Sequence, residues 1–187
     1  MLTETVIHNR YSFHPFGVIR RMDVSIIGGA GHVGLPLALI LTDAGHNVTV
    51  IDKNEMLLES VEEGSFPYYE PGAEALLDDA LAADKLALTT EISAISDSEI
   101  VVVVIGTPID EHNNPEIRNL LNLTVEARPY LREDQLVLLR STVYPGTTKL
   151  VRDRIEEGPL TVGEDLHLAF TPERISQHNS LEEIVDL

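Results

Sequence analysis

The residues of this chain whose types suit ligand binding or proton transfer lie close behind apolar runs of strand length. The carboxyl ends of parallel strands meet at one edge of a sheet, and open α/β sheets bind ligands in the crevice outside that edge. A carboxylate there suits a general base, and hydroxyls there suit hydrogen bonds to a ligand. The positions are Asp52 after residues 48–51, Thr107 after 100–105, Ser141 and Thr142 after 136–139, and Glu173 after 166–170.

A glycine-rich turn near the start of the chain indicates which ligand Asp52 would bind. The turn GAGHVG at residues 29–34 lies between an apolar run at 24–27 and an apolar helical pattern at 35–44. A second β-branched run at 48–51 then ends on Asp52. This order of strand, glycine turn, helix, strand and acid indicates a dinucleotide site. A fold of this type with an empty site, or with FAD or S-adenosylmethionine at the turn, is the alternative.

Each residue of the motif has a physical task. Gly29 permits the tight turn out of the strand, Gly31 lets the backbone approach a pyrophosphate, and Gly34 lets the helix pack closely. The helix N-terminus offers N–H groups and a partial positive charge to the phosphates. Asp52 can accept hydrogen bonds from the adenine ribose and would repel a 2′-phosphate, so NAD is favoured over NADP. Lys53 beside it softens this preference.

Apolar strand patterns alternate with helical patterns along residues 22–187, which predicts an α/β fold with a doubly wound parallel sheet of the Rossmann type. We expect residues 1–21 to be a disordered N-terminal extension, unless Met22 is the true start. No apolar run has the length of a membrane span, and no signal-peptide pattern is present. The expected location is the cytoplasm.

The charge of the chain is strongly negative. It carries 31 acidic and 13 basic residues, a formal net charge of −18, and no cysteine. This charge disfavours nucleic acid and anionic membranes as partners. Without cysteine, the chain has no disulfide, zinc–thiolate site or cysteine nucleophile, and no metal site is predicted. Simple solubility would explain the charge, but a salt-rich cytoplasm that screens self-repulsion explains it better.

The hydroxyl residues at the strand ends also have ordinary structural interpretations. Thr107 with Pro108 could be a turn that ends a strand. Ser141 or Thr142 could cap the next helix, in competition with Thr147. For Glu173 a purely structural interpretation is weaker, because a carboxylate at the end of an apolar strand lies where a general base would be useful.

Several motifs together resemble the UDP-glucose/GDP-mannose dehydrogenase family of nucleotide-sugar dehydrogenases. The resemblance extends from Met22 to the end of the chain. The matching segments are GAGHVGLPLA at 29–38, YEPG at 69–72, GTP at 106–108, STVYPGTT at 141–148 and TPER at 171–174.

The resemblance implies an activity and a role for each candidate residue. The family oxidises the C6 hydroxyl of a nucleotide-linked sugar, such as a UDP-sugar, to a carboxylate with two NAD per turnover, through a thiohemiacetal on a cysteine. Thr142 and Glu173 resemble the pair that orders a water near the reacting carbon. Thr107 and residues 141–143 resemble later cofactor contacts. The residues that resemble the first cofactor contacts are Gly29, Gly31, His32, Val33, Gly34 and Asp52.

The departures from the family pattern are informative. His32 replaces the usual Tyr, and Leu57 replaces an Arg that several members have near the adenosine. Pro-Glu-Arg at 172–174 resembles the acetamido-sugar branch, that of UDP-N-acetylmannosamine dehydrogenase. The family's linking helix and sugar-binding domain, with the catalytic cysteine, lysine and asparagine, are absent from this sequence.

We therefore expect the NAD-binding part of a nucleotide-sugar dehydrogenase, incomplete for catalysis alone, whose other half is missing through truncation or because a separate chain carries it. A non-catalytic NAD-binding or regulatory module and a different small dehydrogenase are the alternatives.

Overall fold

The computed structural model describes residues 20–106, 117–172, 174 and 180–186. Six parallel strands form one sheet in the order β3-β2-β1-β4-β5-β6, which confirms the predicted doubly wound sheet. The strand order reverses between β1 and β4, the neighbours at the centre of the sheet. The strands are β1 (Asp23–Ile27), β2 (Asn47–Ile51), β3 (Leu86–Thr89), β4 (Ile100–Val103), β5 (Leu136–Leu139) and β6 (His167–Phe170).

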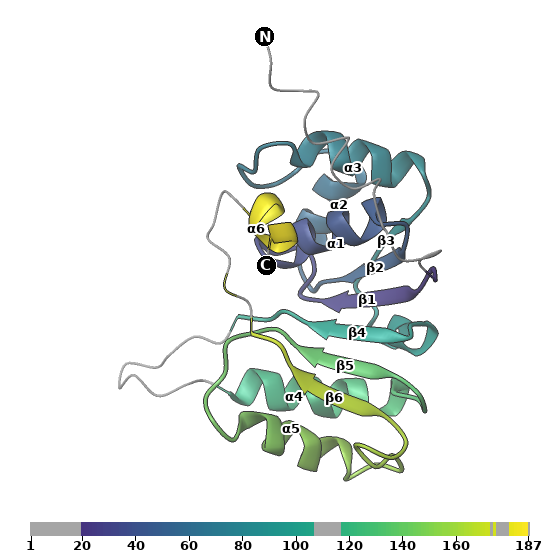
Figure 1. Cartoon of the computed structure of the whole chain (residues 1–187), viewed down its shortest axis with the longest axis vertical. Helices are drawn as coiled ribbons and strands as arrows, with labels where there is room; N and C mark the ends of the chain where they lie inside the picture. The colour runs from purple at the N-terminus through teal and green to yellow at the C-terminus, as the bar shows by residue number, and fades with distance from the viewer. Residues whose placement is uncertain (1–19, 107–116, 173, 175–179, 187) are drawn as a thin grey trace.

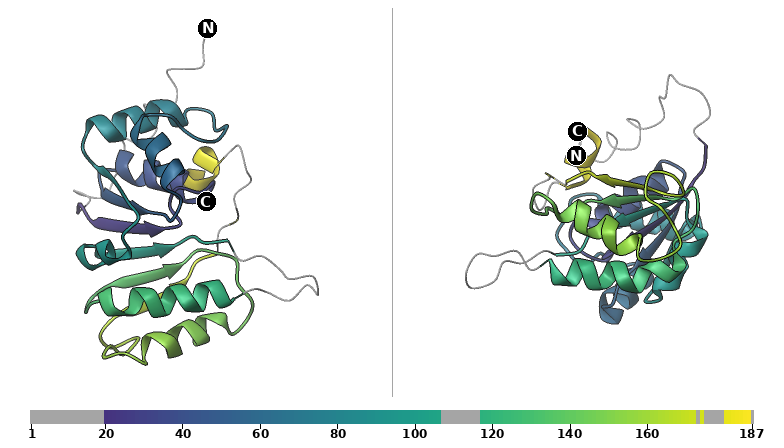
Figure 2. Two further views of the ribbon diagram at one scale, coloured as in Figure 1. Left: turned by 180° about the vertical axis from the view of Figure 1, so that it is seen from behind. Right: turned by 90° about the horizontal axis from the view of Figure 1, so that it is seen from below.

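Helices cover the sheet from both sides (Figures 1 and 2). The helices packed into the first core are α1 (Gly34–Asp43), α2 (Glu55–Glu62), α3 (Ala73–Ala82) and α6 (Ser180–Asp186). The helices on the opposite side are α4 (Arg118–Ala127) and α5 (Thr147–Ile155), together with the short 3-10 helices η1 (Ile92–Asp97) and η2 (Arg128–Tyr130).

Side-chain alternation along the strands divides the apolar residues between the two cores. On β1, Val24 and Ile26 face the first core, whereas Ile27 belongs to the second. On β4, Val102 faces the first core, and its neighbours Val101 and Val103 face the second. The central strand β4 therefore needs apolar residues on both faces, which explains its continuous apolar run in the sequence.

The ends of two helices follow from single residues. Asn54 caps α2, because its Oδ1 accepts a hydrogen bond of 3.3 Å from the N–H of Leu57. The sequence pattern predicts a helix from about Leu120 to Leu131, but α4 ends at Ala127 and the chain tightens into η2. Pro129 causes this difference, because it has no N–H to donate and its ring clashes with the preceding helical turn.

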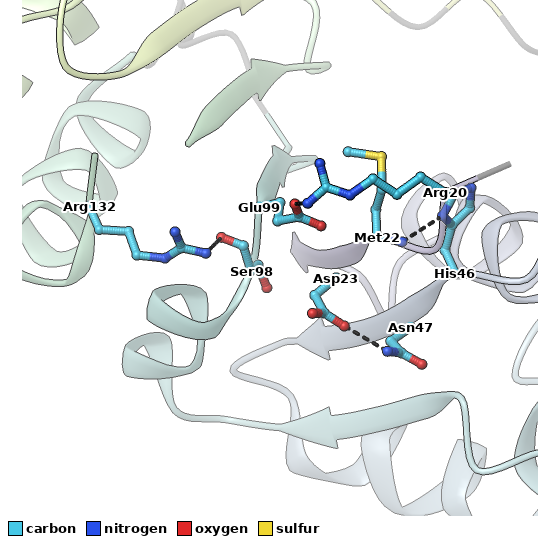
Figure 3. Close-up of polar contacts among 8 residues, drawn as sticks. All are labelled: Arg20, Met22, Asp23, His46, Asn47, Ser98, Glu99 and Arg132. Carbon is cyan, nitrogen blue, oxygen red and sulfur yellow. Dashed lines mark hydrogen bonds and ion pairs between the residues drawn. The ribbon is translucent and has the colours of Figure 1, made fainter. Parts of the chain in front are cut away.

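Polar contacts close the amino edge of the sheet. Gln135 is fully buried, and its Nε2 donates to the carbonyls of Ile95 and Ser98, both at 2.7 Å. Its Oε1 accepts from the N–H of Arg132 at 2.9 Å, and the Arg132 side chain donates to the same Ser98 carbonyl at 2.9 Å (Figure 3). These bonds satisfy the buried carbonyls that end η1 and attach η1 to the loop before β5.

The start of β1 is attached to the start of β2 in the same region (Figure 3). Asn47 donates to the Asp23 carboxylate at 2.6 Å, and the N–H of Met22 donates to Nδ1 of His46 at 3.3 Å.

The described helices include none with the length and apolar composition that a membrane crossing requires.

Candidate functional site

A pocket of about 580 Å³ opens at the carboxyl edge of the sheet, where the strand order reverses between β1 and β4. This reversal of strand order is the place where open α/β sheets bind ligands. The pocket is lined by Ile27, Gly28, Gly31, Ile51, Asp52, Lys53, Thr90, Ile92, Val104, Ile105, Gly106, Asn119, Asn122, Leu123 and Glu126.

The turn into the pocket begins one residue earlier than the sequence motif suggests. Gly28 adopts φ +78°, and a Cβ there would lie 2.3 Å from the carbonyl oxygen of Val104. Its N–H donates to the carbonyl of Ile51 at 2.8 Å, which joins the ends of β1 and β2. Gly28 is a functional residue outside the predicted motif, and the doubled glycine at 28–29 is the sequence signal for it.

The three motif glycines differ in what surrounds them. At Gly29 a Cβ would lie 2.7 Å from the carbonyl oxygen of Ile26, and at Gly34 it would lie 2.6 Å from the Cα of Gly29. Both contacts are with backbone, which cannot move aside. Gly31 meets nothing closer than 3.4 Å and lines the pocket. The absence of a side chain at Gly31 is therefore not needed for packing within the protein, but it leaves space in the pocket for a ligand.

The N-terminus of α1 is free of competing side chains within the described part of the chain. Val33 occupies the N-cap position, no side chain caps the helix, and no acidic residue lies in its first turn. The N–H of Leu35 donates to the carbonyl of Gly31 at 3.0 Å, but no side chain screens the positive end of the helix dipole, which can therefore attract an anion. Since Gly31 lines the pocket three residues before the helix begins, the anion would lie against the turn.

The Asp52 carboxylate helps to shape the turn. Its Oδ2 accepts from the N–H of Ala30 at 3.1 Å, and its Oδ1 accepts from the N–H of Asn54 at 3.0 Å. A carboxylate has about four acceptor positions, so both oxygens keep capacity for a ligand hydroxyl. Its neighbour Lys53 forms an ion pair of 3.0 Å with Glu126 of α4, and both residues line the pocket.

His32 lies outside the pocket lining and is exposed, but it has an aromatic partner. The Tyr68 ring stacks on the His32 ring with centroids 3.7 Å apart. The Tyr68 hydroxyl also donates to the carbonyl of Ala30 at 2.8 Å. Burial, and to a lesser extent the charge of Asp52, raises the pKa of Tyr68, so the phenol remains a donor at neutral pH. No sequence pattern connects Tyr68 with the turn, because the two lie 38 positions apart.

The structure places Ser141 and Thr142 differently. Ser141 is buried, and its hydroxyl donates to the carbonyl of Ile105 at 2.7 Å, which ties the loop after β5 to the loop after β4. Thr142 is exposed at the same edge. No side chain caps α5, whose N-cap is Gly146, so the capping interpretation of the hydroxyls, Thr147 included, is wrong.

Two predicted site residues, Thr107 and Glu173, lie outside the described residues. Their proximity to Thr142 and to the pocket therefore stays a prediction. Within the described ranges, no group of three or more His, Cys, Asp or Glu side chains is placed to hold a metal ion.

Residues 22–187 match the family described as "UDP-glucose/GDP-mannose dehydrogenase family, NAD binding domain". The chain belongs to this family. Its matched part is the family's NAD-binding domain, and NAD is the cofactor of that domain. The family resemblance seen in the sequence is confirmed.

Relatives in the family include enzymes from archaea. The UDP-N-acetyl-D-mannosamine dehydrogenase of Methanococcus aeolicus is 28% identical over 161 residues, 84% of this chain and 35% of the relative. The UDP-glucose 6-dehydrogenase AglM of Haloferax volcanii is 30% identical over 169 residues, 88% of this chain and 39% of the relative. The crystal structure of NDP-N-acetyl-D-galactosaminuronic acid dehydrogenase from Methanosarcina mazei superposes with a TM-score of 0.81 at 31% identity, covering 88% of this chain and 37% of that one. The chain thus spans between a third and two fifths of these relatives.

The different surroundings of Gly31 and Gly34 predict opposite outcomes for the same substitution. We expect Gly34→Ala to lower the free energy of unfolding by about 3 kcal/mol, because the added methyl meets backbone. We expect Gly31→Ala to unfold like the wild type but to bind NAD at least about tenfold more weakly, because its methyl enters the pocket. Urea unfolding and calorimetric titration measure the two quantities. A Gly34→Ala variant of wild-type stability would contradict the assignment.

Proposed function

We propose that this domain binds NAD across the pocket and serves as the cofactor-binding half of a nucleotide-sugar 6-dehydrogenase. The observation that carries the proposal is that the glycine turn, the uncapped start of α1 and Asp52 lie around one pocket, where the strand order reverses between β1 and β4. In this arrangement a dinucleotide has a place for its pyrophosphate and a carboxylate for its adenine ribose.

The cofactor would lie with its pyrophosphate at residues 29–34 and its ribose hydroxyls on Asp52. NAD supplies a hydride acceptor, and the nicotinamide end would extend toward the loops after β4 and β5. Ser141 supports that region by holding the Ile105 carbonyl, so its role in the proposal is to shape the site. Thr107 and Thr142 are the proposed contacts beyond the pyrophosphate.

For the chemistry, we propose that Thr142 and Glu173 order a water at the reacting carbon of the sugar. A carboxylate that shares a water with a hydroxyl can take up the proton released when that water attacks. The proposed substrate is the C6 alcohol of a UDP-sugar. The Pro-Glu-Arg segment at 172–174 supports an acetamido sugar, and the relative from Methanococcus aeolicus is named for such a substrate.

In this proposal the complete oxidation requires residues beyond the 187 of this sequence. Relatives are more than twice as long as the segment that they share with this chain, and this chain contains no cysteine to hold a covalent intermediate. We propose that a separate C-terminal half supplies the nucleophile and most of the sugar site.

The proposal predicts NAD binding without turnover by this chain alone. Titration calorimetry in molar KCl should detect NAD with a dissociation constant on the order of micromolar to millimolar. NADH formation from UDP-sugars should appear only after a cysteine-bearing C-terminal half of a family member is added. Failure to bind millimolar NAD would refute the proposal.

Two other outcomes would select an alternative. NAD binding without any rescue of turnover would favour a non-catalytic or regulatory module. Oxidation of an alcohol by this chain alone would indicate a different small dehydrogenase.

The ion pair of Lys53 with Glu126 bears on the choice between NAD and NADP. Lys53 is the cation beside Asp52 that would attract a 2′-phosphate, and its pairing with Glu126 at 3.0 Å offsets that attraction. The Glu126 carboxylate of α4 would thus strengthen the preference for NAD that Asp52, directly after β2, is proposed to establish. The pair is exposed, so its effect is moderate and falls with salt.

We therefore expect Glu126→Gln to tighten NADP binding by about threefold at moderate ionic strength while leaving NAD binding within about twofold. The matched control is Glu157→Gln, which removes an equally exposed paired carboxylate on the chain segment after α5. Competition titrations with both cofactors measure the ratio. If the ratio of the NADP and NAD dissociation constants were unchanged in Glu126→Gln, Lys53 would not interact with the 2′-phosphate.

We also propose that the domain works in a salt-rich cytoplasm. The charged residues of α2 and α3 are all acidic, and neither helix has a base in its last turn. Acidic side chains at a helix C-terminus oppose the helix dipole, and salt screens both this effect and the mutual repulsion. The relative from Haloferax volcanii is consistent with this proposal.

Thermal unfolding in dilute buffer should therefore occur at a clearly lower temperature than in molar KCl. Glu62→Gln, at the end of α2, should raise the midpoint in dilute buffer and change it little in molar KCl. Circular dichroism follows both transitions. Equal midpoints at low and high salt would contradict the proposal.

A further inference from the structure

The loop at residues 65–72 lies across the glycine turn and is anchored on both sides of it. Phe66, 8% exposed, fixes the start of the loop in the first core and meets the Tyr68 ring edge-on, with centroids 6.0 Å apart. Tyr68 stacks on His32. Further along, the Glu70 carboxylate accepts from the N–H of Leu181 at 3.1 Å, which attaches the loop to α6.

The hydroxyl of Tyr68 acts on the central residue of the turn. Ala30 is fully buried, its N–H donates to Asp52 at 3.1 Å, and its carbonyl accepts from Tyr68 at 2.8 Å. The peptide unit between Ala30 and Gly31 is also held at its other side, because the N–H of Gly31 donates to the carbonyl of Gly28 at 3.3 Å. Two consecutive peptide planes are therefore fixed in orientation.

These two planes lead directly into the segment that would hold the pyrophosphate. A peptide unit without its carbonyl partner can rotate, and each freedom lost on binding reduces the affinity. If the two peptide planes are already fixed in the free protein, ligand binding no longer has to restrict their rotation, and the affinity is higher. Neither the glycines nor Asp52 holds the Ala30 carbonyl among the described residues, so this task belongs to Tyr68.

We propose that Tyr68 is a positioning residue for dinucleotide binding, which acts by holding the Ala30–Gly31 peptide in the orientation that receives the pyrophosphate. This inference rests on the proposed binding of NAD at the glycine turn. Tyr68 does not line the pocket, and it acts on the ligand through the backbone of the turn. The same loop also contacts α6 through Glu70, and α6 packs against α1.

The test is Tyr68→Phe, which removes the hydroxyl and keeps the ring contacts with His32 and Phe66. NAD and ADP should both bind about five- to tenfold more weakly, as expected for one lost hydrogen bond that positions the site. Adenosine, which has no pyrophosphate, should bind with unchanged affinity in an NMR titration. Hydrogen exchange at the Gly31 amide should become faster. Tyr130→Phe, in η2, is the matched control and should change none of these quantities.

The possible results distinguish a failure of the positioning role of Tyr68 from a failure of the proposed NAD binding. Unchanged NAD affinity in Tyr68→Phe, or an equal loss for adenosine and ADP, would overturn the positioning role. Unchanged exchange at Gly31 would overturn it as well. If the wild-type protein itself failed to bind NAD, the proposed function would fail, and the effect of Tyr68 on Gly31 exchange would still report whether it holds the turn.

Discussion

The N-terminus of α1 rests on the turn after β1 with no space for a side chain between them. A Cβ on Gly34 would lie 2.6 Å from the Cα of Gly29, so helix and turn are in backbone contact. This contact sets the distance between α1 and the sheet and places the first N–H groups of the helix beside the pocket. It also brings Leu35 and Leu39, both fully buried, into the first core. The ligand site and the packing of the first core therefore both depend on the close contact between Gly34 and Gly29.

The two edges of the sheet differ in how their polar groups are satisfied. At the amino edge, protein groups provide the partners: Gln135 alone binds two carbonyls and one N–H, and Arg132 reinforces one of them. At the carboxyl edge, the uncapped start of α1 leaves N–H groups without a side-chain partner in the described structure. Because buried polar groups are costly to leave unpaired, an edge of this second kind favours a ligand that carries acceptors.

Asp52 shows that the shape of the turn and the recognition of a ligand depend on one group. Its carboxylate holds the N–H of Ala30, and it faces the pocket that would receive the ribose. Tyr68 completes the arrangement from a loop on the other side of the turn, and Glu126 moderates the charge of Lys53 from α4. Residues from distant parts of the chain thus tune a motif that is itself local.

The sequence by itself determined the sheet, the glycine turn and the family, because these depend on local patterns: strand-length apolar runs, helical periodicity and a fixed spacing from Gly29 to Asp52. Thr107 and Glu173 remain predictions of that kind. Only the tertiary structure decided that Ser141 points inward to the Ile105 carbonyl, that Lys53 is paired, and that Tyr68 holds Ala30. The physical reason is that each of these contacts joins residues between 36 and 73 positions apart, and their proximity arises only when the strands assemble in their crossed order.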